Sequence, residues 1–80
     1  MPRKARQPAK HPVLKLVGRR VRVLREQQGL SQEALADRAR MGRSYMSGIE
    51  RGVRNCSALH LVKLARALGV SVGEFFTTPS

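Results

Sequence analysis

The chain has 80 residues with 16 Lys and Arg against 5 Asp and Glu, which gives a formal net charge of +11 and a pI near 11.7. This length allows one domain with a small core, and so one-sided a charge favours a polyanionic partner, nucleic acid before an anionic membrane. The single cysteine excludes an internal disulfide and no apolar run could span a membrane, so we expect a cytoplasmic protein without metal or cofactor.

Residues 1–12 carry four cationic side chains and three prolines with almost no apolar surface. A segment of this composition cannot bury enough surface to order itself, so the pattern predicts a flexible basic tail. Such a tail either wraps a DNA duplex and adds salt-dependent affinity or stays solvated. We place one helical domain at residues 13–76 and a short C-terminal tail at residues 77–80.

From Val13 onward the pattern is that of helices joined by short turns. The first apolar stripe recurs at helical spacing and ends before Gly29; it comprises Val13, Leu16, Val17, Val21 and Leu24. Four later helix starts share a hydrophobic staple, in which one apolar residue precedes the cap and another lies four positions after it. These caps are Ser31, Gly42, Ser57 and Ser71. Glu74 follows Ser71 at the third helical position, which predicts a capping box.

The sequence therefore predicts an all-α fold of five helices, since no stretch alternates with a period of two for long enough to form a strand. The expected helices are 13–28, 32–39, 43–51, 58–68 and 72–76, with Gly52 and Gly69 at helix C-termini. With the first helix, the following residues are expected to form the core: Leu35, Ala39, Met46, Ile49, Leu61, Leu64, Ala65, Leu68 and Phe75.

The predicted helix 43–51 has a polar side that carries no acid. At about 100° per residue, its polar arc holds Arg43, Ser44, Ser47, Gly48 and Arg51. A B-DNA major groove admits one α-helix, and its base edges suit arginine and serine. Gly48 costs about 1 kcal/mol relative to alanine in a helix interior and removes bulk where the helix approaches bases. The alternative is an ordinary solvated face.

The segment from Leu30 to Gly52 resembles the helix-turn-helix of phage repressors and their bacterial relatives, the Cro/repressor or Xre-like class. The resemblance rests on Gln32 at the start of the first helix, Ala36 at the helix crossing, and the endings "SGIERG" and "LVKLARALGVSVGEFF". It covers about residues 13–76. It implies a compact, five-helix, lambda-repressor-like domain that binds a palindromic operator as a homodimer and often regulates its own promoter.

The resemblance also implies roles for individual residues. Arg43 and Ser44 are expected to read bases, Ser47 to reach a base or a phosphate, and Gly48 to occupy a later base-facing position. Expected phosphate contacts come from Gln32, Arg51, Arg54 and Asn55.

Glu50 faces inward on the helix wheel and needs a partner, and the resemblance assigns Arg25 on the first helix to it. Three positions depart from the family pattern. Arg40 stands where glycine is usual, so either it adopts a left-handed backbone or the turn is reshaped. Gly42 replaces a hydroxyl cap, and Cys56, where proline is common, is expected to pack as a buried staple residue rather than act as a redox switch.

Two further surfaces are expected. Glu33 and Asp37 lie four residues apart on one helix face, where acids of some phage-repressor relatives contact RNA polymerase. The alternative is ordinary helix electrostatics. The aromatic cluster at Val72, Phe75 and Phe76 is the candidate dimer interface, although an intramolecular role for both aromatics is equally compatible with the sequence.

The sequence also bears on two other classes of function. An enzyme is not expected, because the chain has no nucleophile–base pair, metal cluster or phosphate loop. An antitoxin that neutralises a toxin and binds its own operator remains an alternative, although we expect no toxin-binding segment after Phe76. A membrane-surface role is weaker, because no continuous apolar face lies opposite the basic residues.

Overall fold

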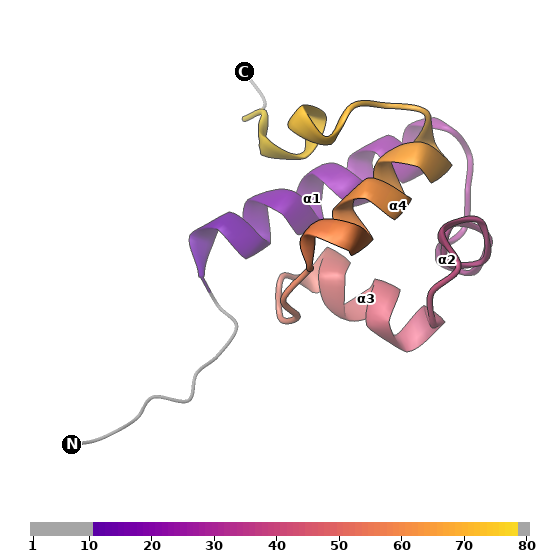
Figure 1. The fold of residues 1–80 in the computed structure, drawn as a ribbon, viewed down its shortest axis with the longest axis horizontal. Coiled ribbons are helices and arrows are strands. Elements are labelled where there is room, and N and C mark those ends of the chain that lie inside the picture. Colours follow the sequence, from indigo (N-terminus) through magenta and orange to yellow (C-terminus); the bar gives the residue numbers. More distant parts are fainter. Residues whose placement is uncertain (1–10, 79–80) are drawn as a thin grey trace.

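The computed structural model describes residues 11–78, which form four α-helices and a short 3-10 helix without any strand (Figure 1). The elements are α1 (Pro12–Gln27), α2 (Gln32–Ala39), α3 (Arg43–Arg51), α4 (Ala58–Leu68) and η1 (Val72–Phe76). The all-α prediction is confirmed. The predicted tail falls almost wholly on residues 1–10 and 79–80, which lie outside the described part of the chain.

Side-chain and backbone caps explain where most helices begin and end. The Ser31 and Ser57 hydroxyls accept hydrogen bonds from the Ala34 and His60 amides at 3.0 and 3.2 Å. Pro12 at the first turn of α1 follows His11, whose Nδ1 accepts from the Val13 amide at 3.1 Å. These bonds satisfy amides at the helix N-termini that have no partner within the helix.

The last predicted helix is corrected in two respects. Residues 72–76 form a 3-10 helix rather than an α-helix, and Ser71 makes no side-chain capping bond. Glu74 does not close a capping box, because its carboxylate accepts from Arg20 Nη2 at 3.2 Å while its carbonyl accepts from Arg20 Nε at 3.0 Å. The Glu74 carboxylate, which the local pattern assigned to the N-terminus of its own helix, thus binds a charged donor on α1 instead.

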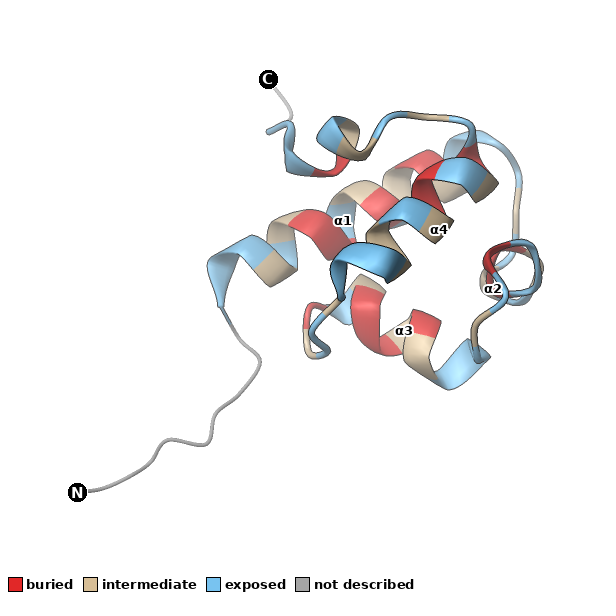
Figure 2. Cartoon of the chain, in the orientation of Figure 1, coloured by how far each residue is buried: buried red, intermediate tan, exposed pale blue. Residues whose placement is uncertain are grey.

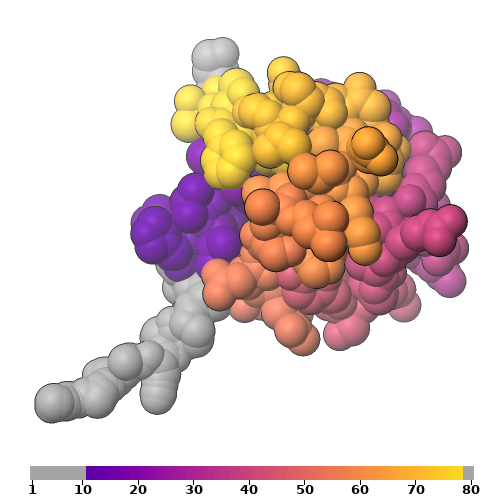
Figure 3. Space-filling model, viewed as in Figure 1, coloured from indigo at the N-terminus to yellow at the C-terminus, as the bar shows by residue number. Residues whose placement is uncertain are grey.

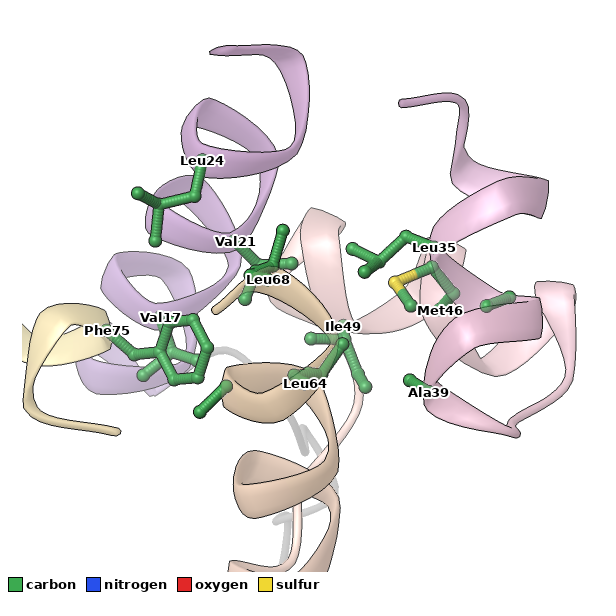
Figure 4. Close-up of a cluster of buried hydrophobic side chains, with 12 residues drawn as sticks. Val17, Val21, Leu24, Leu35, Ala39, Met46, Ile49, Leu64, Leu68 and Phe75 are labelled. Atoms are coloured by element: carbon green, nitrogen blue, oxygen red, sulfur yellow. The ribbon is translucent and has the colours of Figure 1, made fainter. Parts of the chain in front are cut away.

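The core lies where α1, α3, α4 and η1 converge, with α2 closing one side (Figure 4). Every predicted core residue is buried except Leu61, which is partly buried and packs at the edge of the cluster. Phe75 from η1 is fully buried beside Val17 of α1, and with the Arg20–Glu74 bonds it holds η1 against the domain. Burying such a side chain stabilises by roughly 1.5–3 kcal/mol.

Two glycines allow the end of α3 to lie directly against α1. A Cβ at Gly18 would collide with the Ile49 carbonyl oxygen and lie 2.7 Å from that of Glu50. A Cβ at Gly52, which has a φ of +74°, would lie 2.9 Å from the Lys15 Cα. This close approach buries one side of α3 and leaves its N-terminal residues exposed (Figure 2).

The turn between α2 and α3 keeps its usual backbone in spite of Arg40. Arg40 has φ 56° and ψ 53°, the left-handed conformation, and its amide bonds to the Asp37 carbonyl at 3.1 Å. Of the two expectations for this turn, the strained backbone is the one observed. For a residue other than glycine this conformation costs about 1–2 kcal/mol.

Candidate nucleic-acid interface

Five of the predicted DNA-contacting residues surround one open hollow on the surface. The hollow has a volume of about 270 Å³ and is lined by Gln32, Arg43, Ser44, Ser47 and Arg51. Gln32 comes from the start of α2 and the other four from the polar face of α3. The four residues of α3 lie together because of their helical spacing, as the sequence predicted. Gln32 lies beside them because the turn at Arg40 brings the start of α2 next to α3.

The charged residues that line the hollow are both arginines, and no acid is among its lining residues. Among residues 11–78, the ion pairs join Glu26, Glu50 and Glu74 to arginines of α1 only. Arg43 and Arg51 are exposed and take part in none of these pairs. Their guanidinium groups therefore remain available as donors to an anionic partner.

A partly buried charge network joins α3 to α1 and α2. Arg25 donates from Nε and Nη2 to the Glu50 carboxylate at 2.7 and 3.1 Å, which confirms the predicted pair. The Glu50 side chain is only 3% exposed, so the bidentate bond compensates for the removal of its charge from water. The hydrogen bond to Glu50 raises the pKa of Arg25, against the opposing effect of burial.

Gln32 also belongs to this network. Its Nε2 donates to Glu50 Oε1 at 2.9 Å, a contact that the sequence did not indicate. The amide retains a second hydrogen, and the Gln32 backbone N–H lies at the N-terminus of α2, where no carbonyl of the helix can reach it. Glu50 thus orients a residue that was predicted to bind a phosphate.

Gly48 is placed differently from the prediction. It is buried, and a Cβ there would collide with Cγ of Arg54 and lie 3.3 Å from its Cβ. The stem of Arg54 therefore covers the backbone that was expected to be bare toward bases. The helix wheel missed this contact because Arg54 lies in the loop after α3 and folds back over the helix.

Arg54 and Asn55 are exposed in the loop that joins α3 to α4, as a phosphate-binding pair requires. The Arg54 guanidinium lies 5.5 Å from the centroid of the Tyr45 ring, and the Tyr45 hydroxyl donates to the Asn55 carbonyl at 2.7 Å. Partial burial raises the pKa of Tyr45. Tyr45 is partly buried on α3 and supports the loop that carries both candidate phosphate ligands.

The remaining predicted residues lie away from the hollow. Glu33 and Asp37 are exposed on α2 and form no ion pair among the described residues.

In the candidate dimer cluster, Phe75 is 0% exposed and Val72 is partly buried, which leaves Phe76 at 45% exposure. Of the two roles expected for Phe75, the structure therefore shows the core role and not the interface role. Cys56 is partly buried, which raises the pKa of its thiol to about 11.

Residues 11–78 contain no group of three or more His, Cys, Asp and Glu side chains arranged to hold a metal ion. Within the same residues no helix combines the length and the apolar composition that a membrane crossing needs.

Comparisons with known proteins place this surface in context. A family model described as helix-turn-helix matches residues 21–75. The HTH-type regulator y4dJ of Sinorhizobium fredii is 44% identical over 63 residues, or 79% of this chain and 82% of that protein. Control protein C.BamHI of Bacillus amyloliquefaciens is 42% identical over 66 residues, with the same two shares. The crystal structure of the restriction-modification controller C.AhdI of Aeromonas hydrophila has a TM-score of 0.80 and 45% identity over 82% of this chain and 100% of that chain.

Proposed function

We propose that this chain, which belongs to the Xre-like helix-turn-helix family of DNA-binding transcription regulators, binds a palindromic operator as a homodimer with α3 in the major groove. The family consists of regulators and not of enzymes. The observation that carries the proposal is the acid-free surface around the hollow, where five predicted DNA ligands meet. Localisation in the cytoplasm, on the nucleoid when bound, follows from this function.

Arg43, Ser44 and Ser47 are the base-reading residues of this proposal. They lie on the exposed or partly exposed face of α3, and arginine and serine match the donors and acceptors of the major groove. Gly48 is left out, because in the free protein Arg54 covers it. Base preference therefore depends on very few side chains, with Arg43 as the only long one near the N-terminus of α3.

The phosphate contacts come from the two ends of this surface. Gln32 offers its second amide hydrogen and the N-terminal amides of α2 to one phosphate. At the other end, the DNA backbone is bound by Arg51, the last residue of α3, and by Arg54 and Asn55 in the loop that follows. All three residues are exposed. These contacts set the register of α3 in the groove and supply most of the affinity, whereas they carry no sequence preference.

The homodimer is proposed to form through α4 and η1, which pack together and lie side by side on one face (Figure 3). Phe76 keeps its predicted interface role, and α4 adds Leu59 and Val62, which are 63% and 42% exposed. Leu59 and Val62 lie three residues apart on α4 and so share a face, and an exposed apolar face of this kind fits a surface that a partner covers. A twofold dimer places its half-sites one DNA turn apart, near 34–36 Å.

Regulation of its own promoter is proposed from the similarity to C.BamHI and C.AhdI, which are named as a control protein and a restriction-modification controller. Glu33 and Asp37 are proposed to contact RNA polymerase from a DNA-bound dimer. Both are exposed on α2 and unpaired among the described residues, so their charge is available beside the DNA-binding face.

The proposal is tested by selecting bound duplexes from a random DNA pool and measuring the mass of the complex formed with the selected sequence. We expect a palindromic consensus, half-sites about 10 bp apart, and two chains per duplex. Phe76→Glu, which places a charge on the proposed interface, is expected to remove the palindrome while one half-site is retained. Uniform, salt-sensitive binding without a consensus contradicts the proposal, and a tight protein complex with a toxin would favour the antitoxin alternative instead.

A further inference from the structure

Gly48 lies in the middle of α3, where glycine is a poor helix former, and the reason for it is visible in the structure. Its α-carbon lies beneath the Arg54 stem: a Cβ added there would collide with Arg54 Cγ and lie 3.3 and 3.5 Å from Cβ and Cδ. These atoms form the base of the Arg54 side chain and not its flexible end. Any side chain at position 48 therefore displaces the whole arginine from α3.

The far end of Arg54 is also held. Its guanidinium lies 5.5 Å from the Tyr45 ring centroid, at cation–π distance. The ring is fixed in turn by the bond from its hydroxyl to the Asn55 carbonyl at 2.7 Å and by the His60 ring, whose centroid is 4.7 Å away. The arginine is thus supported along its stem and at its charged group, although it remains exposed.

We propose that Gly48 and Tyr45 are positioning residues that hold Arg54 across the end of α3, ready to bind a DNA phosphate. The inference rests on the proposed DNA-binding function and assigns Gly48 a role different from base contact. An arginine ordered before binding loses less side-chain entropy when it meets a phosphate, so preorganisation raises affinity without any new contact. It acts equally on every DNA sequence, because phosphates carry no base information.

A double-mutant cycle tests the arrangement. Gly48→Ala, Arg54→Ala and the double variant are titrated, over a range of salt concentrations, against the selected operator and an unrelated duplex of equal length. Arg54→Ala is expected to weaken binding about tenfold and to reduce the salt slope by about 0.9. Gly48→Ala is expected to weaken binding about twofold to tenfold on both duplexes, which is the effect of ordering one long side chain. In the Arg54→Ala background, Gly48→Ala is expected to have no effect.

Arg22→Ala is the matched control for Arg54→Ala, since Arg22 is 63% exposed on α1, outside the DNA-binding surface and the proposed dimer interface. It removes the same side chain away from α3, so affinity and salt slope are expected to stay close to those of the wild type. Far-UV circular dichroism of every variant checks that the helices are intact.

Tyr45 provides a second arm. Tyr45→Phe keeps the ring under the guanidinium and is expected to keep the affinity, whereas Tyr45→Leu removes the ring and is expected to weaken binding only when Arg54 is present. The inference is overturned if Gly48→Ala weakens binding equally in both Arg54 backgrounds, or if it changes the preferred base. Either result means that Gly48 faces DNA directly. If the wild type binds both duplexes equally, the proposed sequence-specific function is refuted. The positioning role of Gly48 is still tested in that case, because the double-mutant cycle can be measured on the unrelated duplex.

Discussion

Removal of one partner of the pair between Arg25 and Glu50 should strongly destabilise the domain, and Arg25→Met tests this. The substitution keeps much of the apolar stem but leaves the Glu50 carboxylate, 3% exposed, with Gln32 as its remaining side-chain partner. It also removes the bond from Arg25 Nη1 to the Leu30 carbonyl at 2.7 Å. Breaking a buried pair from one side costs about 3–5 kcal/mol.

This loss is large for so small a protein. At about 0.05–0.15 kcal/mol per residue, a domain of 80 residues has roughly 4–12 kcal/mol of stability in all. A loss of about 3 kcal/mol lowers Tm by about 12–24 °C, at about 4–8 °C per kcal/mol. Thermal and urea unfolding followed by circular dichroism at 222 nm measure both quantities.

Arg22→Met is the matched control on the same helix. Arg22 pairs with Glu26 at 3.1 Å, but the two side chains are 63% and 53% exposed, so its removal is expected to cost less than about 0.5 kcal/mol. The reasoning is refuted if Arg25→Met destabilises the protein no more than Arg22→Met. A double replacement of Arg25 and Glu50 by apolar residues should recover part of the loss, because it leaves no uncompensated buried charge.

Three further results are expected. Gly18→Ala should lower the free energy of unfolding by about 1–3 kcal/mol in urea titrations, because its Cβ meets the Ile49 carbonyl; an unchanged midpoint would mean that α1 and α3 are not in close contact. Arg40→Gly should raise that free energy by about 0.5–1 kcal/mol, and a loss would show that the left-handed backbone is not strained. The thiolate absorbance of Cys56 should titrate near pH 11, because burial raises the pKa of this thiol from its ordinary value of 9.0 to about 11 in the folded protein. The unfolded chain then loses the proton at lower pH than the folded one, so the free energy of unfolding should fall as the pH rises from 9 to 11. Titration near 9.0 would contradict the burial of the thiol.

Local patterns predicted most of this fold because the signals that place its helices are local. Ser31 and Ser57 cap the helices they were expected to cap, and the staple residues around them lie against the core. The pairing of Glu50 with Arg25 could be foreseen for a different reason: an inward acid on a helix needs a cation, and the resemblance supplied the residue.

The features that were missed depend on residues far apart in the chain or outside regular structure. Glu74 was assigned to a capping box, but Arg20, 54 residues earlier, provides a charged donor that the neutral backbone amide of Ser71 does not match. Gln32 is oriented by Glu50 across 18 residues. Gly48 was assigned to the DNA face by the helix wheel, which treats α3 as an isolated cylinder and cannot register the loop residue that folds over it.

Arg43 is proposed to read base pairs, whereas residues at the C-terminal end of α3 and after it are proposed to hold phosphates. The most direct measurement compares Arg43→Ala with Arg51→Ala in binding to a complete set of single-base variants of the selected operator. We predict that Arg43→Ala loses discrimination at one base pair in each half-site, about 1–3 kcal/mol, and that Arg51→Ala weakens binding to every variant by the same factor. Equal, uniform losses for the two variants would show that α3 does not read bases through Arg43, and would contradict the account.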